Sequence, residues 1–384
     1  MMSSESSSLQ TASGDAAASK GKVSFFQANK SLIQISVLSG CGVACTLAFE
    51  KARVFDPSVI QDQMDFSRFV MLKMFLTAVT TGLVSMSALS IIPATKQKFM
   101  IARDAFVGPL KCKGILSSAI GGALLGMGMT ISGTCPGMVF VQIGGGVSNA
   151  VYTLAGGFAG VLVYGLVEPF IRSAIRPAQP AKHHWMDHYL GMNFASVALP
   201  LAVVIGSVVA AVEYYVPWST EVVTSNTGNF LTVPSWSPIV SGMMIGLAQV
   251  PLVLTVDDTL GSTTAYRTIL AQLIPNSLSK KLLSYFHGIQ NNMDSWWQVI
   301  YLGSIMITAY VSASLSHNYN SVQGVSIPSS LIGGFLLLFG SRLASGCTSG
   351  HGLSGLALLK VLSFVNVPAI FAGAMGLQFI RNLL

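Results

Sequence analysis

Two cysteines, Cys135 and Cys347, stand at the centres of glycine-rich breaks in otherwise apolar stretches of the chain. Each lies the same distance beyond a Gly-Gly pair, since Gly122 to Cys135 and Gly334 to Cys347 are both thirteen positions. A thiol is a soft, polarisable and weak hydrogen-bond donor. It can hold a sulfur atom without a tight grip, and a conducting site must also release what it binds.

Residues that interrupt a helix surround both cysteines: Gly133, Pro136, Gly137, Gly346, Gly350 and Gly352. Backbone that leaves helical geometry at membrane depth is tolerated only where it is buried in protein or lines a polar cavity. Helix starts after such breaks direct unpaired N–H groups and a positive dipole end toward the cavity, which favours an anion. Uncharged hydroxyl groups accompany them at Ser132, Thr134, Thr348, Ser349 and Ser354. We predict weak anion binding at the two breaks.

The composition indicates an integral membrane protein. Hydrophobic residues make up 52% of the 384 residues and charged residues only 9%, which is too little charge for a soluble globular surface. No basic stripe with interleaved aromatic residues accompanies the net charge of +7, so no nucleic-acid partner is predicted. The five cysteines are an odd number and fall mostly within or beside apolar segments, which argues against a disulfide framework.

Nine stretches are long and apolar enough to span a bilayer, which requires about 17 to 25 residues. They lie near residues 32–49, 69–93, 114–132, 150–168, 193–216, 237–256, 296–315, 326–344 and 353–380. Residues 1–31 are rich in Ser and Ala and are predicted to form a disordered tail. The expected organisation is this tail, a first transmembrane repeat over 32–168, a linker with one transmembrane helix over 169–236, and a second repeat over 237–384.

The distribution of Lys and Arg predicts the orientation. With the N-terminus in the cytoplasm, fourteen of the 21 basic residues fall on the cytoplasmic side and four on the outer side, while Lys73, Arg342 and Lys360 fall within spans. We therefore expect a multi-pass protein, in the plasma membrane, with a cytoplasmic N-terminus and an external C-terminus.

The span count also predicts the side of the membrane from which each break enters. Spans one to four and spans six to nine each carry a cysteine break between their third and fourth members, and the fifth span separates the halves. An odd linker inverts the second half relative to the first, as in many secondary transporters. The predicted fold is an all-α polytopic membrane protein with two inverted-topology repeats, whose re-entrant loops bring Cys135 in from the outside and Cys347 in from the inside.

Residues 346–355, Gly-Cys-Thr-Ser-Gly-His-Gly-Leu-Ser-Gly, resemble the signature of the YeeE/YedE family of sulfur-transport membrane proteins. The first break is similar to that family's other cysteine loop, with Thr134-Cys135-Pro136-Gly137 followed by Gln142 and three glycines at 144–146. Two looser matches are Phe49-Glu50-Lys51-Ala52-Arg53 and Gly261-Ser262-Thr263-Thr264. The resemblance covers most of residues 32–380.

This resemblance implies an hourglass-shaped uptake protein for thiosulfate, in which cysteines along a central path contact the terminal sulfur of the substrate. Carried over by motif, that role falls to Cys135 and Cys347. Bacterial members often have a third cysteine soon after the Arg of the first element, whereas this chain continues with Val54-Phe55. Either Cys41 or Cys45 takes the third place, or no third thiol takes part.

Other residues leave two readings open. Arg342, near Cys347, either attracts the anion or faces the cytoplasm. His351 either shuttles a proton or hydrogen-bonds the re-entrant backbone. Asp257 and Asp258, after the sixth span, either assist a cation or cap a helix.

The membrane potential opposes entry of an anion, so uptake needs a separate driving force. Moving a dianion inward against an inside-negative potential costs about 2.3 kcal/mol per charge per 100 mV. The transport reading therefore requires either a cotransported cation, such as a proton or sodium ion, or consumption of the anion inside the cell. No cofactor is predicted.

Two other classes of function are weaker readings of the same residues. One is a membrane sulfurtransferase-type enzyme with a persulfide on Cys347, which needs a low thiolate pKa supplied by a helix start or by a cation such as Arg342 or His351. The other is a soft-metal channel, but the 17 Met are scattered and no paired metal-ligand spacing is present.

Overall fold

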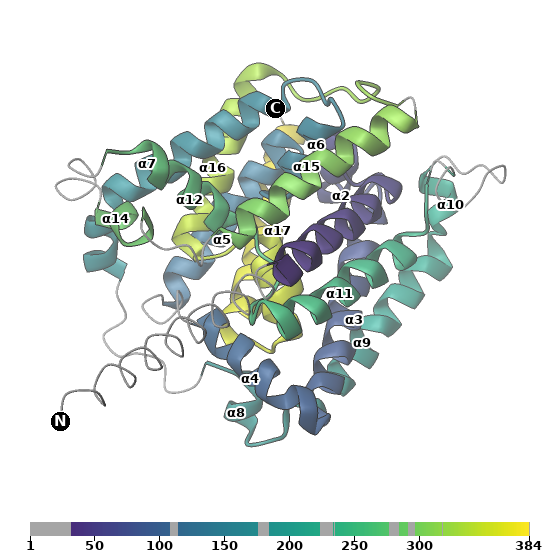
Figure 1. Cartoon of the computed structure of the whole chain (residues 1–384). Helices are drawn as coiled ribbons and strands as arrows, with labels where there is room; N and C mark the ends of the chain where they lie inside the picture. Colours follow the sequence, from purple (N-terminus) through teal and green to yellow (C-terminus); the bar gives the residue numbers. More distant parts are fainter. Residues whose placement is uncertain are drawn as a thin grey trace, which may run out of the picture.

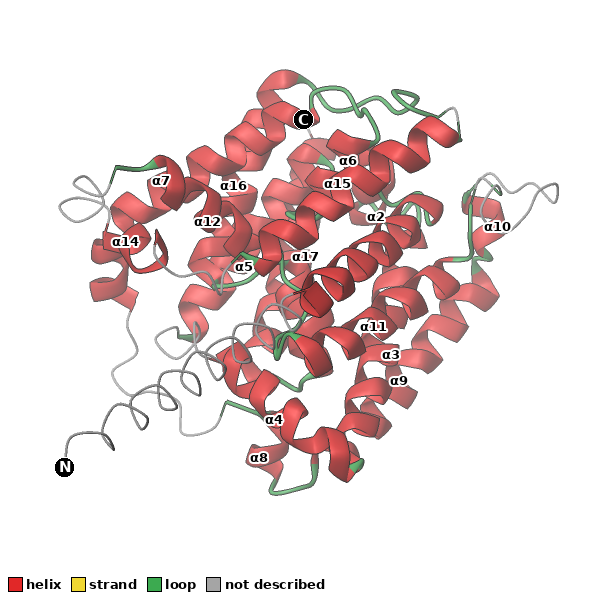
Figure 2. Cartoon of the chain, viewed as in Figure 1, coloured by secondary structure: helices red, strands yellow, loops and turns green. Residues whose placement is uncertain are grey.

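The computed structural model describes residues 32–107, 114–175, 184–222, 233, 235–275, 284–290, 296–316 and 318–383. Its regular structure in these ranges is helical, apart from one isolated bridge between Trp185 and Lys360 (Figure 2). The tail predicted for residues 1–31 lies outside the described residues, as does Cys112.

Nine helices in the described part of the chain are long and apolar enough to cross a membrane. They are the first span Leu32–Lys51, α3 (Val70–Ile91), α5 (Ile115–Ser132), α7 (Ala150–Ile175), α9 (Phe194–Tyr215), α11 (Pro238–Thr255), α15 (Trp297–Leu315), α16 (Ile327–Ala344) and α17 (Val361–Leu383). The prediction of an all-helical chain with nine candidate spans is confirmed.

The boundary predicted for the ninth span is wrong. The last long helix begins at Val361 and not at residue 353, because residues 348–355 form a separate π-helical segment, η3 (Thr348–Gly355). The apolar residues 356–359 that follow η3 are mostly buried, so their composition mimics a span, but Leu359 has a positive φ of 59° and ends the turn there. Lys360 therefore precedes α17 instead of lying within a span.

Short helices that the span pattern did not predict connect the long ones: α2 (Pro57–Met64), α4 (Pro93–Val107), α6 (Met138–Gly144), α8 (Met186–Leu190), α10 (Trp218–Glu221), α12 (Thr263–Leu273) and α14 (Ser284–Gln290). Local capping accounts for several helix starts. The Asp56 carboxylate accepts the N–H of Ser58 at 3.0 Å, and Pro57 occupies the first turn of α2. Serine hydroxyls cap α11 and α16 in the same way, again with proline in the first turn.

Helices α5 and α16 form the centre of the bundle. They pack against each other, α5 also packs against α17, and α16 also packs against α7 (Figure 1). Glycine permits these close approaches. A Cβ added at Gly126 of α5 would lie 1.9 Å from the carbonyl oxygen of Ile370, and one at Gly334 of α16 would lie 2.1 Å from that of Thr153.

The contacts around this centre come in matched pairs. Helix α3 touches η3 of the second half, while α15 touches α6 of the first half. Helix α2 touches α17, and α12 touches α7. Helix α3 therefore lies against the segment that follows Cys347, and α15 lies against the helix that follows Cys135.

Helix α9 lies at the edge of the bundle and packs mainly on α3 (Figure 1). A buried ion pair ties this edge together, because Lys73 of α3 is fully buried and its Nζ lies 2.7 Å from Glu221 and 3.0 Å from Glu213. A buried ammonium requires such partners. At the opposite end, α4 and α8 are joined by two hydrogen bonds from Arg103 to Asp187, at 3.1 and 2.7 Å.

We expect Gly126→Ala to destabilise the protein by about 1 to 3 kcal/mol, because its methyl group would overlap the backbone of α17. Gly376→Ala, also in a long helix but with nothing within 4 Å of an added Cβ, is the matched control and should melt like the wild type or slightly higher. Thermal unfolding in detergent measures both. Equal melting of the two variants would contradict the packing described here.

Candidate functional site

The first break begins where α5 ends. Gly133 has a left-handed φ of +59° and donates its N–H to the carbonyl of Met129 at 2.8 Å. A Cβ at this position would lie 2.4 Å from the Cβ of Pro57, so both the conformation and the space require glycine. The chain then passes through Cys135, whose sulfur faces the backbone N–H groups of Gly137 and Met138, and enters α6.

The second break begins where α16 ends, at Ser345 with a φ of +63°. Gly346 follows, and a Cβ there would lie 2.5 Å from the ring of His351, so the buried imidazole occupies the space that a side chain would need. Cys347 is the N-cap of η3. Single turns of π-helix are rare and are often found at functional sites.

Hydroxyl and amide groups surround the Cys347 thiol, which is 1% exposed. Its Sγ lies 3.3 Å from Oγ of Ser262 and 3.0 Å from Oγ of Ser349. It also accepts the N–H of Gly350 at 3.4 Å. No charged side chain takes part in these contacts, so the groups around the thiol are polar but uncharged.

The start of α12 joins the two breaks. Ser262, which contacts Cys347, also lies beside Gly137 of the first break, where an added Cβ would be 3.6 Å from its Oγ. One turn later, the Tyr266 hydroxyl donates to the carbonyl of Pro136 at 2.7 Å. The structure thus brings the two predicted motifs together through a loosely matched third.

Two cavities lie on either side of the Cys347–Ser349 contact. Cys135, Thr348 and Ser349 line a cavity of ≈ 50 Å³ whose walls are otherwise apolar and include Met71, Met74, Phe75, Met129, Met138 and Phe371. Cys347 lines a second cavity of ≈ 110 Å³ with polar walls that include Asp258, Thr259, Thr263, Thr264, Gln298 and His351. The Thr348 hydroxyl, 3.3 Å from Sδ of Met129, belongs to the wall of the first.

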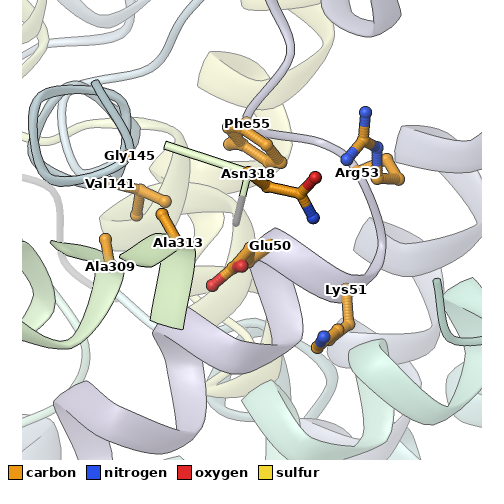
Figure 3. Close-up of a pocket in the computed structure, with 9 residues that line it drawn as sticks. All are labelled: Glu50, Lys51, Arg53, Phe55, Val141, Gly145, Ala309, Ala313 and Asn318. Atoms are coloured by element: carbon orange, nitrogen blue, oxygen red, sulfur yellow. The ribbon is translucent and has the colours of Figure 1, made fainter. Parts of the chain in front are cut away.

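A third, smaller pocket of ≈ 10 Å³ lies at the end of the first span (Figure 3). Figure 3 shows Glu50 and Lys51 on the last turn of that helix, with Arg53 and Phe55 on the loop beyond it. Residues of the same segment, Phe49 and Val54, line the Cys135 cavity. This loop therefore separates the small pocket from the methionine-lined cavity.

A matched pair of hydrogen bonds holds each break against the loop after the first span of its own half. Gln142, seven residues after Cys135, donates to the carbonyls of Phe55 at 2.9 Å and Gly133 at 3.0 Å. Ser354, seven residues after Cys347, donates to the carbonyl of Leu260 at 2.9 Å. All three bonds satisfy loop carbonyls.

His351 and Arg342 make hydrogen bonds to neighbouring backbone and side-chain groups. His351 is fully buried, and its two ring nitrogens lie 3.0 Å from the Ser363 hydroxyl and 3.2 Å from the carbonyl of Ala344. Since a carbonyl only accepts, Nε2 carries a proton and donates it to Ala344. Arg342 donates to Thr263 at 3.1 Å and to the Tyr285 hydroxyl at 3.3 Å.

Cys41 and Cys45 lie on the first span, outside the two break segments themselves. Cys41 donates to the carbonyl of Ala248 at 3.5 Å, and Cys45 is hydrogen-bonded to Tyr301. Both thiols are buried, and neither is among the lining residues of the three cavities described above.

The sequence left two readings of Asp257 and Asp258, cation assistance or a helix cap. The N-cap of α12 is Ser262, Asp258 lines the Cys347 cavity, and Asp257 forms an ion pair with Lys98 at 2.6 Å. The hydroxyl of buried Thr134 donates to the carbonyl of Cys135 at 3.4 Å. Sequence reasoning missed Tyr266 and the methionines, which carry no motif because their roles depend on which helices meet.

Most of the chain matches a known protein family. The profile of the family described as Sulphur transport matches residues 51–376, which contain both breaks and all three cavities except Phe49 and Glu50 at their edge. The chain belongs to the sulphur transport family. The protein is thus a membrane transporter of a sulfur-transport family, and the family resemblance expected from the motifs is confirmed.

Individual relatives are distant. The thiosulfate transporter TsuA of Escherichia coli (strain K12) is 21% identical over 280 residues, covering 67% of this chain and 72% of TsuA. A probable transporter of Xylella fastidiosa (strain Temecula1 / ATCC 700964) is 27% identical over 137 residues, covering 35% of this chain and 86% of that protein. A probable transporter of strain 9a5c of the same species is 26% identical over the same length.

Thiol accessibility should differ among the cysteines of this sulphur transport family member. Cys135 is partly exposed within its cavity, whereas Cys45 is fully buried against Tyr301. We expect a small methanethiosulfonate reagent to modify Cys135 at least about tenfold faster than Cys45, because reaction at Cys45 requires local opening. Mass spectrometry of single-cysteine variants measures the rates. Equal rates would contradict the assignment of Cys135 to a cavity wall.

Proposed function

We propose that this protein takes up thiosulfate, or a related sulfur-containing anion, along a path that passes Cys135 and Cys347. The family supports sulfur transport as the general activity. The narrower choice of thiosulfate is supported by the distant relative named as a thiosulfate transporter and by the soft thiols at the breaks.

The observation that carries the proposal is the junction at Ser262, which contacts the Cys347 thiol and lies beside Gly137 of the other break. On this proposal the anion passes from the pocket at Glu50–Arg53 to the Cys135 cavity, then past the Ser349 and Ser262 hydroxyls into the Cys347 cavity. Each thiol and hydroxyl offers one weak donor to the anion. Thr348 and Gly350 shape the passage, while Gln142, Ser354 and His351 hold its backbone.

We further propose that the two halves are inverted-topology repeats and that the breaks are re-entrant. The exchanged contacts of α3 with η3 and of α15 with α6 support a two-fold relation. So do the hydrogen bonds of Gln142 and Ser354, each seven residues after its cysteine. An inverted pair would let the two cavities open to opposite sides of the membrane.

The proposed orientation has the N-terminus in the cytoplasm and the C-terminus outside, in the plasma membrane, as the excess of basic residues in the cytoplasmic loops favours. With this orientation, the pocket at Glu50 faces outward and the Cys347 cavity faces inward. The proposal also includes a driving force, either a cotransported cation or consumption of the anion inside the cell.

The enzyme alternative requires a helix start or a cation to activate the Cys347 thiol. Cys347 is the N-cap of η3 and accepts the N–H of Gly350 at 3.4 Å. Neither named cation bonds the thiol, since Arg342 donates to Thr263 and Tyr285 and the His351 ring lies between Ser363 and the carbonyl of Ala344. Among the residues that the structure describes, no three His, Cys, Asp or Glu side chains gather as a metal site would require.

Uptake of labelled thiosulfate by the reconstituted protein tests the function. We expect Cys135→Ala and Cys347→Ala each to lower the initial rate about tenfold, since losing a donor along the path costs about 0.5 to 1.5 kcal/mol and leaves neighbouring groups unpaired. Cys112→Ala, at a thiol outside both breaks, is the matched control and should transport normally. Cys41→Ala and Cys45→Ala decide whether a third thiol takes part. Normal rates in both break variants would refute the proposed path.

The orientation has its own test. Epitope tags at the two ends should differ in access, with the C-terminal tag labelled by antibody on intact cells and the N-terminal tag labelled only after permeabilisation. This result follows from an odd number of spans together with the positive-inside bias. Tags that label together on intact cells would require an even number of spans.

A further inference from the structure

Asp258 is the one carboxylate among the described residues that line the ≈ 110 Å³ cavity of Cys347, and no Lys or Arg is among them. It lies on the loop after α11, outside the spans. Its Oδ1 accepts the N–H of Thr259 at 2.8 Å, and the Trp297 indole also donates to the carboxylate. Burial raises the pKa of this carboxyl to about 6, against the opposing effect of those two donors.

The charged and titratable groups around Asp258 are already engaged. Lys98 of α4 pairs with the neighbouring Asp257 at 2.6 Å. Arg342 reaches the cavity wall through its 3.1 Å bond to Thr263. The His351 ring lies between the Ser363 hydroxyl and the carbonyl of Ala344. None of these bonds is made to the Asp258 carboxylate.

An anion in this cavity would share it with the Asp258 side chain. Both the Cys347 thiol and the Asp258 carboxylate line this cavity of ≈ 110 Å³. Like charges within one cavity of low dielectric disfavour the ionised carboxyl. Binding of the anion therefore favours the protonated form of Asp258.

We propose that Asp258 is a proton-binding residue of the transport site, and that the anion and one proton occupy the Cys347 cavity together. The inference rests on the proposed function and adds the identity of a co-bound ion. The carboxylate takes up one proton from solution as the anion enters, and the carboxylic acid returns it as the anion leaves. No other bond forms or breaks.

The direction of the pH dependence follows from linkage. Below the pKa of about 6 the empty site already holds the proton, so the affinity for the anion is at its maximum. Above this pH a proton must be taken up together with the anion, so the KM for thiosulfate should rise about tenfold for each pH unit. Thiosulfate itself does not titrate in this pH range, so the change in KM reports a group on the protein.

The experiment uses the full-length protein in proteoliposomes, with the same pH on both sides, and measures the KM for labelled thiosulfate between pH 6 and 8. The wild type should show the rise, and Asp258→Asn should show a flat profile near the low-pH wild-type value. Asp257→Asn, which removes the neighbouring carboxylate of the Lys98 pair, is the matched control and should keep the wild-type slope. Asp258→Glu should also retain a slope.

A second measurement does not depend on the variants. In weakly buffered detergent solution at pH 7.5, adding thiosulfate to the wild type should take up close to one proton per protein, read with a pH indicator. Wild-type binding without proton uptake, or an unchanged slope in Asp258→Asn, would overturn the inference while leaving thiosulfate transport standing. Absence of thiosulfate uptake at every pH would instead refute the proposed function.

Discussion

Two stretches of non-helical backbone lie between apolar helices, and the surrounding structure is arranged to satisfy their polar groups. A bilayer offers no hydrogen bonds, so each broken carbonyl or amide must find a partner within the protein. Gln142 and Ser354 supply donors to loop carbonyls, and Tyr266 supplies one to Pro136. The His351 ring closes the end of α16 at Ala344. The breaks persist because these side chains replace the missing helical bonds.

The same requirement applies to the buried basic side chains. Lys73 and Arg103 are each buried beside carboxylates, while Arg342 donates to the hydroxyls of Thr263 and Tyr285. The groups left at the Cys347 thiol are hydroxyls and a backbone amide, which bind an anion weakly. Such lining suits passage better than capture, since a site that binds tightly also releases slowly.

Close packing at the centre links the two halves mechanically. Glycines bring α5 against α17 and α16 against α7 at backbone distance, so a shift of one helix displaces its neighbour. The outer helices α3 and α15 each rest on the break of the opposite half. Ser262 lies between the two breaks, in contact with Cys347 and beside Gly137.

The sequence by itself determined the class of protein, the nine candidate spans and the two breaks, because hydropathy and glycine placement are local properties. It also determined the family, through the residues around Cys347. It misplaced the start of the last helix, since the buried residues 356–359 are as apolar as a true span.

Only the tertiary structure decided that Ser262 touches Cys347 and that Asp258 shares its cavity. It likewise decided that Cys41 donates to the carbonyl of Ala248 and that Cys45 is hydrogen-bonded to Tyr301. These outcomes depend on which distant helices pack together, and contacts between residues some 85 positions apart leave no periodic trace in the chain.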